Sequence, residues 1–263
     1  MKLNKQYLAC LSIILLALAS CKKGNQEFVY KNELFPVSLT GYNGSSEELL
    51  IKLGDFDLPI PLSANSSFAQ SNAYIFKAGE EKLKLTVSEK NTGKQVLEKE
   101  LKKTDGTANV NFLYMDGRIG PMPAKPAVEN DKVTLIYMFQ PTLSNYSEPV
   151  DFVMGKYYLV PQVFEEVARA KNVKPYEFCA PVSLPTFATG RQDYNGVITS
   201  VSFIVRICKA GTNIPYTDGT AYTWNALSSS APKPAASIAS SKLYIFSEAP
   251  NGNTMSFFTR LAL

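Results

Sequence analysis

Serine, lysine, cysteine and the carboxylic acids are the residues that could do chemistry in this 263-residue chain, because it contains no histidine. Without imidazole there is no Ser-His-Asp triad, no Cys-His pair and no zinc site built on histidine. No two of the four cysteines stand in a Cys-x-x-Cys pair, which argues against a thiolate metal site or a dithiol redox motif. The composition predicts no metal site and no cofactor.

One serine and one lysine have the spacing Ser-x-x-Lys, at Ser230 and Lys233. In penicillin-recognising enzymes that serine opens a helix and acts as the nucleophile. Here Pro232 and Pro234 flank the lysine, and proline disrupts a helix interior because it removes backbone donors. An irregular loop is therefore predicted at this position, and no catalytic residue is assigned.

Acid–base chemistry on a carbohydrate needs no histidine, since glycoside hydrolysis requires only two carboxyl groups across a sugar ring. The acids considered for this role are Glu165, Glu166, Asp193 and Asp218. On a helix, Glu165 and Glu166 would project about 100° apart and would not face one substrate as a pair. A carbohydrate-active enzyme that uses Asp or Glu is kept as the alternative function.

Aromatic side chains are the remaining candidates for a binding role, because exposed rings can stack on sugars or anchor a protein partner. Tyr194, Tyr222 and Trp224 are the candidate residues of a binding face, since they lie near Asn-Gly or Asp-Gly turns. Packing into a β core is the alternative interpretation of the same residues.

Cys179 and Cys208 are the two cysteines beyond residue 21. Both neighbourhoods have strand character, and in an oxidising compartment such a pair can form a disulfide. Two separate buried thiols are the alternative, and the sequence does not choose between them.

The elements that must position these residues are predicted to be antiparallel β-strands. Apolar residues occupy every second position at 82–88, 133–139 and 201–207, as expected of strands with a buried face. Asn-Gly and Asp-Gly dipeptides, which favour tight hairpin turns, recur along the chain. The fold class expected is mostly β, with two consecutive immunoglobulin- or transthyretin-like antiparallel β-sandwich domains.

The domain boundary is predicted at a proline-rich linker over residues 118–131, because prolines stiffen the chain and remove donors that a sheet needs. The N-terminal sandwich is expected over residues 31–117 and the C-terminal one over 132–263. Residues 161–172 are the exception to the β pattern. Their apolar residues recur at helical intervals, which predicts one short helix in the second sandwich.

The chain opens with two lysines, an apolar run from Leu8 to Leu18, and then Ala19-Ser20-Cys21. The run is shorter than the ~20 apolar residues that a membrane-spanning helix needs. This opening resembles a bacterial lipoprotein signal with its lipobox. The resemblance implies that residues 1–20 are a signal peptide, that Cys21 is lipidated, and that residues 21–30 are a lipidated tether. An ordinary secretory signal is the alternative.

Lys22 and Lys23 follow Cys21, and the aspartate that commonly marks inner-membrane retention is missing. Sorting to the outer membrane is therefore expected. The periplasmic face is favoured over the cell surface, because no acidic run follows the cysteine. The net charge of +4 is too small to indicate a nucleic-acid partner.

A lipobox followed by two β modules and a proline-rich link resembles the tandem-sandwich lipoproteins frequent in Bacteroidota. The function expected is that of a lipid-anchored envelope protein. It would act as a non-enzymatic binding or scaffolding module for a glycan or an envelope protein partner.

Overall fold

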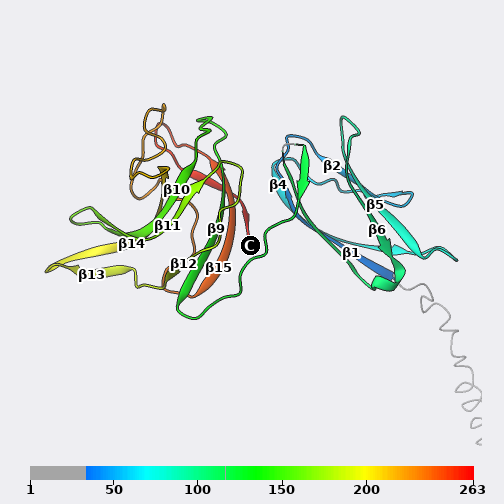
Figure 1. Ribbon diagram of the computed structural model, residues 1–263, viewed down its shortest axis with the longest axis horizontal. Helices are drawn as coiled ribbons and strands as arrows, with labels where there is room; N and C mark the ends of the chain where they lie inside the picture. Colours follow the sequence, from blue (N-terminus) through cyan, green and yellow to red (C-terminus); the bar gives the residue numbers. More distant parts are fainter. Residues whose placement is uncertain (1–33, 116) are drawn as a thin grey trace, which may run out of the picture.

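The computed structural model describes residues 34–115 and 117–263, and strands dominate them (Figure 1). The predicted signal peptide at 1–20, the tether at 21–30 and Cys21 all lie outside the described residues. Among the described residues, none of the helical segments has the length and apolar character needed to cross a bilayer. The predicted mostly β character is confirmed, whereas the immunoglobulin- or transthyretin-like assignment stays a prediction.

The N-terminal module, residues 34–120, contains two four-stranded sheets. The first has the order β4-β1-β7-β8, with β4 at Ser66–Ile75, β1 at Leu34–Asn43, β7 at Ala108–Met115 and β8 at Arg118–Gly120. The second has the order β3-β2-β5-β6, with β3 at Phe56–Asp57, β2 at Leu49–Leu53, β5 at Lys82–Glu89 and β6 at Gln95–Lys102. A short 3₁₀ turn, η2 at Lys103–Asp105, follows β6.

The C-terminal module, residues 132–263, also contains two four-stranded sheets. One has the order β12-β9-β15-β16, with β12 at Val182–Pro185, β9 at Lys132–Gln140, β15 at Ser240–Glu248 and β16 at Phe257–Ala262. The other has the order β11-β10-β14-β13, with β11 at Val163–Val173, β10 at Val150–Tyr158, β14 at Val197–Lys209 and β13 at Gly190–Tyr194.

The two modules have nearly the same topology. Counted from the first strand of each module, one sheet has the order fourth-first-seventh-eighth in both. In both, the first strand pairs in parallel with the seventh, as β1 with β7 and β9 with β15, and the other strand pairs are antiparallel. The second sheet differs only in its last two positions, which are fifth-sixth in the N-terminal module and sixth-fifth in the C-terminal one. The chain therefore contains a structural repeat.

Strand β5 illustrates why the alternating segments form these sheets. Leu83, Leu85 and Val87 are buried in the core, while Lys82 and Lys84 point to solvent and pair with glutamates of β6. The alternation predicted for residues 82–88 is confirmed. The two-residue Asn195-Gly196 turn between β13 and β14 is also as predicted, since both residues have the positive φ that this turn requires.

The helix predicted over residues 161–172 is wrong, because this segment is β11, paired antiparallel with β10. Two register irregularities give β11 more residues than β10 opposite them, and extra residues of this kind break the two-residue alternation. Apolar residues then recur at spacings that resemble a helix. Gly155 allows the close approach, because a Cβ atom there would lie 2.1 Å from the Glu165 carbonyl oxygen.

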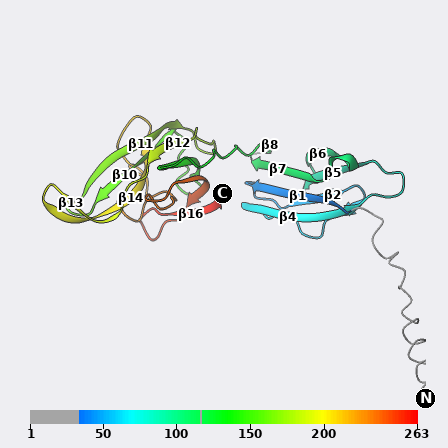
Figure 2. The same ribbon diagram turned by 90° about the horizontal axis from the view of Figure 1, so that it is seen from below.

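The linker is shorter than predicted. Residues 118–120 form β8, which pairs with β7, so the segment between the last strand of one module and the first of the next begins at Pro121. Figures 1 and 2 show the modules side by side along the longest axis of the molecule. Tyr42, Met115 and Met122 are buried with the core of the C-terminal module, and the Tyr42 hydroxyl donates to Gln140 Oε1 at 3.2 Å.

Candidate ligand-binding site

The three aromatic residues predicted to form a binding face are anchored to different sheets. Tyr194, on β13, packs against Tyr158 with ring centroids 4.2 Å apart. Tyr222 and Trp224 are half-buried against the core of the C-terminal module. The residue between them, Thr223, is hydrogen-bonded to Asn253 and Met255, next to β16. Packing against the β core is the alternative interpretation of these aromatic residues, and it agrees with the positions of Tyr222 and Trp224.

Cys179 and Cys208 are separate, buried, free thiols, so the disulfide that the sequence left open is not formed. Cys208 lies on β14, whereas the Cys179 thiol accepts a hydrogen bond from the Tyr137 backbone of β9, in the opposite sheet. Burial raises the pKa of both thiols, that of Cys208 to about 11. A buried thiol of raised pKa holds little of the reactive thiolate at neutral pH.

The four acids considered for carbohydrate chemistry each have a local partner. Glu165 accepts a hydrogen bond from the Tyr158 hydroxyl, and Glu166 forms an ion pair with Arg169. Asp193 accepts the Gly196 backbone N–H inside the β13–β14 turn, and Asp218 forms an ion pair with Lys209. The structure does not join any two of them in a hydrogen-bonded carboxyl pair.

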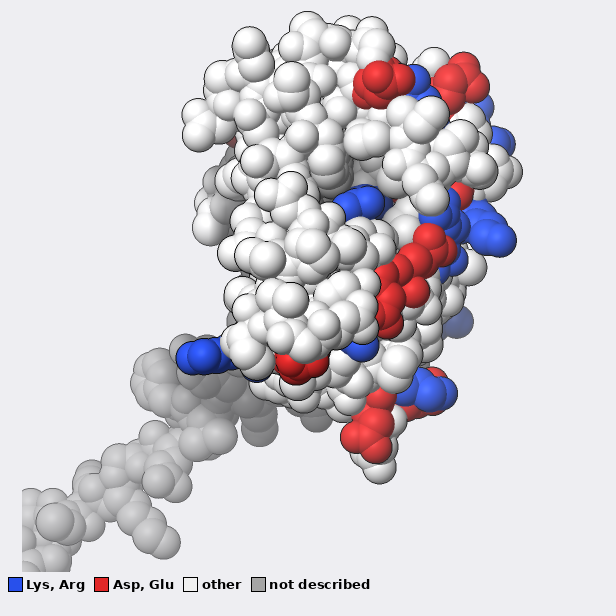
Figure 3. Space-filling model, turned by 90° about the vertical axis from the view of Figure 1, so that its left-hand side faces the viewer, with Lys and Arg blue, Asp and Glu red and all other residues white. Residues whose placement is uncertain are grey.

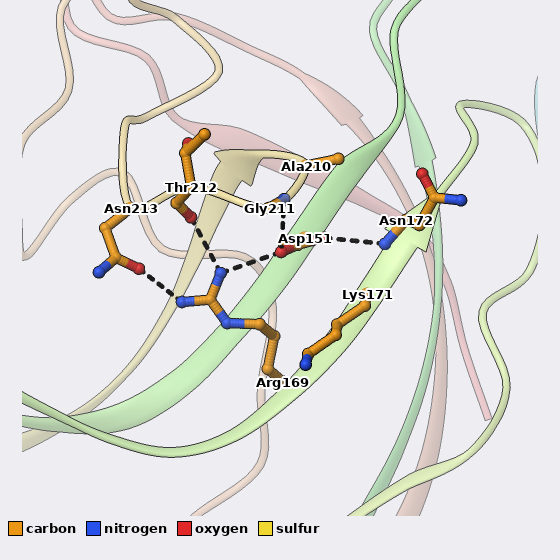
Figure 4. A pocket seen from close by; sticks show the side chains of 8 residues that line it. All are labelled: Asp151, Arg169, Lys171, Asn172, Ala210, Gly211, Thr212 and Asn213. Atoms are coloured by element: carbon orange, nitrogen blue, oxygen red, sulfur yellow. Dashed lines mark hydrogen bonds and ion pairs between the residues drawn. The ribbon is translucent and has the colours of Figure 1, made fainter.

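A buried ion pair that sequence reasoning missed lies in a hollow of about 750 Å³ (Figure 4). Arg169 Nη1 donates to Asp151 Oδ2 at 2.9 Å, and the Asp151 side chain is 1% exposed. Asp151 also accepts the backbone N–H groups of Asn172 and Gly211. The sequence feature that could have revealed this ion pair is the single acid in the apolar run Val-Asp-Phe-Val-Met of β10.

This Arg169 cluster is complete within the protein. The guanidinium also donates to Glu166, the Thr212 carbonyl and the Asn213 side chain, so its five N–H donors are engaged. Burial acts to raise the pKa of Asp151, but the hydrogen bonds from Asn172, Arg169 and Gly211 outweigh it, and the pKa lies below its usual value. The cluster joins β10, β11 and the turn after β14, and it leaves no donor of Arg169 free for a ligand.

A second buried carboxylate, Glu248 on β15, is also satisfied within the module. It accepts the backbone N–H groups of Leu143 and Ser144 at 2.7 Å and the Tyr216 hydroxyl at 2.8 Å. Buried polar groups that are fully hydrogen-bonded rigidify a fold. Glu248 therefore holds the segment after β9 and the segment after β14 against β15.

A groove of about 570 Å³ between β14 and the segment 227–236 has a different character. Its hydroxyl groups come from Thr189, which precedes β13, and from Ser200 and Ser202 on β14. Leu227 and Pro234 belong to its apolar lining. The groove combines an apolar wall with a few polar groups, which is the usual composition of a ligand site.

Lys233 is the one charged residue among those that line this groove. Its side chain is half-buried, and burial lowers its pKa from the usual value. Nζ donates to Ser230 Oγ at 2.8 Å. No carboxylate of the described chain lies within 4.0 Å of Nζ.

The Ser-x-x-Lys pair therefore does meet in space, in the irregular segment that was predicted. Ser230 Oγ also accepts the Val205 backbone N–H at 3.0 Å and donates to the Ala231 carbonyl at 3.1 Å. With both acceptor positions and its proton in use, this hydroxyl holds Lys233 in place and fixes the segment to β14.

Figure 3 looks onto the end of the C-terminal module that carries β13, at the left of Figure 1. Acidic and basic side chains gather along one edge of this view, and much of the remaining surface shows no charged residue. Within residues 34–115 and 117–263, no group of three or more Cys, Asp or Glu side chains is placed to hold a metal ion.

The fold and the groove define a two-module, mostly β protein with a lysine-bearing hollow in its second module. No family model and no curated protein matches the chain. A function can therefore be argued only from the residues of the site.

Proposed function

We propose that this protein is a lipid-anchored envelope protein that acts as a non-enzymatic binding or scaffolding module for a glycan or an envelope protein partner. The lipobox-like sequence that ends at Cys21 supports the anchor, with the periplasmic face of the outer membrane as its place. Two consecutive β modules, in our proposal immunoglobulin- or transthyretin-like, would then hold the partner away from the membrane.

The observation that carries the proposal is the groove beside Lys233. Sugars present hydroxyl groups and apolar C–H faces together, and the groove offers serine and threonine hydroxyls next to Leu227 and Pro234. Its volume of about 570 Å³ falls within the range of small-ligand sites, roughly 300–1,000 Å³. A bound sugar unit would meet a matching surface there.

The carboxyl groups favour binding over hydrolysis. A glycosidase needs one carboxyl whose pKa is raised, so that it can donate a proton. Within residues 34–115 and 117–263, the carboxyl groups with a shifted pKa are Glu89, Glu98, Asp151 and Glu166, and all four shifts are downward, which keeps these groups ionised. None of the four lines the groove.

Binding is tested with the full chain, purified from membranes in detergent, on a glycan array and by co-purification of envelope proteins after cross-linking. We expect a bound glycan or protein that is lost in Ser200→Trp, which fills the groove from β14. Ser67→Trp is the matched control, since Ser67 is an exposed strand serine of the N-terminal module. A folded protein that captures nothing in either assay contradicts the proposal.

The anchor is tested separately by mass spectrometry of the native protein and by metabolic labelling with a fatty acid. We expect acyl groups on residue 21 and no label in Cys21→Ser. An unmodified Cys21 thiol in the native protein would contradict the lipid anchor and would leave the binding test unaffected.

A further inference from the structure

We propose that the groove beside Lys233 selects glycans that carry carboxylate groups, such as polymers of uronic acids. This inference rests on the proposed binding function and names the class of ligand. It follows from one cation, from the groups that surround it, and from the space in front of it.

Two N–H donors of Lys233 are not used within the described chain. An ammonium group has three N–H donors, and one of them is directed to Ser230 Oγ. No other polar contact of Nζ occurs in the described chain, so two donors remain for a ligand. Arg169 provides the contrast, because its five donors are all directed to protein oxygens.

Lys233 also lacks a counter-ion in the described chain. A half-buried cation without a counter-ion is unfavourable, since it has lost part of its hydration and gained no opposite charge. Burial alone accounts for the lowered pKa of Lys233, which means that no carboxylate compensates for it. A ligand carboxylate would supply the missing opposite charge and would raise the pKa of Lys233 again.

The residues around Lys233 match the rest of such a ligand. A uronic acid unit carries one carboxylate, several hydroxyl groups and apolar C–H faces. The hydroxyls of Thr189, Ser200 and Ser202 can bond the sugar hydroxyls, while Leu227 and Pro234 can pack on a C–H face. The groove contains no acidic residue that would repel the carboxylate.

The test is calorimetric titration of the full chain with oligogalacturonate and with its methyl ester of equal length, which lacks the charge. Oligosaccharides of hyaluronan and their esters form a second pair. We expect the acid of at least one pair to bind tenfold or more tightly than its ester. In Lys233→Met the acid should lose that advantage, and Lys233→Arg should retain most of it.

Lys171→Met is the matched control, because Lys171 is an exposed lysine that lines the hollow of the Arg169 cluster rather than the groove. It should bind as the unmodified protein does. Equal binding of acid and ester, undiminished binding by a folded Lys233→Met, or no binding of any acidic probe would overturn the inference. Capture of a neutral glycan or an envelope protein in those cases would leave the proposed function standing.

Discussion

The two modules have nearly the same strand order, but their polar groups lie in different places. In the N-terminal module, strands such as β2 alternate strictly between buried and exposed positions, and the ion pairs of β5 with β6 lie on the surface. In the C-terminal module, β9, β10 and β15 are buried almost throughout, and Asp151 and Glu248 are buried with them. Nearly the same strand order thus occurs once with its ion pairs at the surface and once with carboxylates buried in the core.

The greater burial of strands in the C-terminal module arises from the segment between β14 and β15. Residues 210–239 run beside β14, where Tyr216 bonds to Ile207 and Ala231 bonds to Val205. This segment includes the buried residues Tyr216, Ala231 and Ala236, and it carries Lys233. The added cover explains why polar side chains of this module need internal partners, and why burial lowers the pKa of Lys233, which has no counter-ion in the part of the chain described.

The largest expected effect on stability comes from breaking a buried ion pair, and breaking an exposed ion pair is the comparison. Asp151→Ala should lower the free energy of unfolding by about 3–5 kcal/mol, because it removes the buried partner of Arg169 and leaves the backbone N–H groups of Asn172 and Gly211 without an acceptor. Lys82→Ala, which removes a surface pair with Glu100 in the N-terminal module, should cost less than about 1 kcal/mol. Urea denaturation measures both, and equal losses would contradict the distinction between the modules.

The pH dependence of the free energy of unfolding should reflect the ionisation of Asp151 in the same ion pair. Because hydrogen bonds hold the pKa of Asp151 below its unfolded value, its contribution is present above that unfolded value, about 3.9. The contribution is lost as the pH falls through the lower folded pKa. Asp151→Asn should therefore weaken the loss of stability below pH 4. An unchanged acid profile in thermal unfolding would count against this role.

A smaller effect tests whether the modules unfold together. Tyr42→Phe removes the hydroxyl that donates to Gln140, at an expected cost of about 0.5–1.5 kcal/mol. Tyr42 is buried in the interface, so the ring itself should stay packed. Calorimetry should show the loss in the transition of both modules. A change confined to one transition would indicate that the modules unfold separately.

The smallest effect concerns Lys233. Removing a half-buried cation that lacks a counter-ion should not destabilise the C-terminal module, so Lys233→Met should keep or slightly raise the melting temperature. Thermal unfolding without ligand measures this. A large loss of stability would show that the ammonium group supports the fold rather than a ligand.

Much of the fold follows from local pattern. The alternation at residues 82–88 predicts β5, and Asn195-Gly196 predicts the β13–β14 turn. The pattern failed at β11, because its extra residues relative to β10 hide the strand period. Local pattern also does not show that Tyr222 and Trp224 pack partly against the core, since the sequence shows an aromatic ring near a turn but not the residues that the ring meets. A binding face formed by these rings stays a prediction.

The sequence by itself determined the mostly β class and the absence of imidazole chemistry, because these depend on composition and near-neighbour spacing. Only the tertiary structure decided that Asp151 meets Arg169, that the two thiols lie apart, and that Lys233 faces a groove without a counter-ion. Such features depend on which segments become neighbours across sheets. Burial and charge compensation are properties of that arrangement rather than of any local stretch of chain.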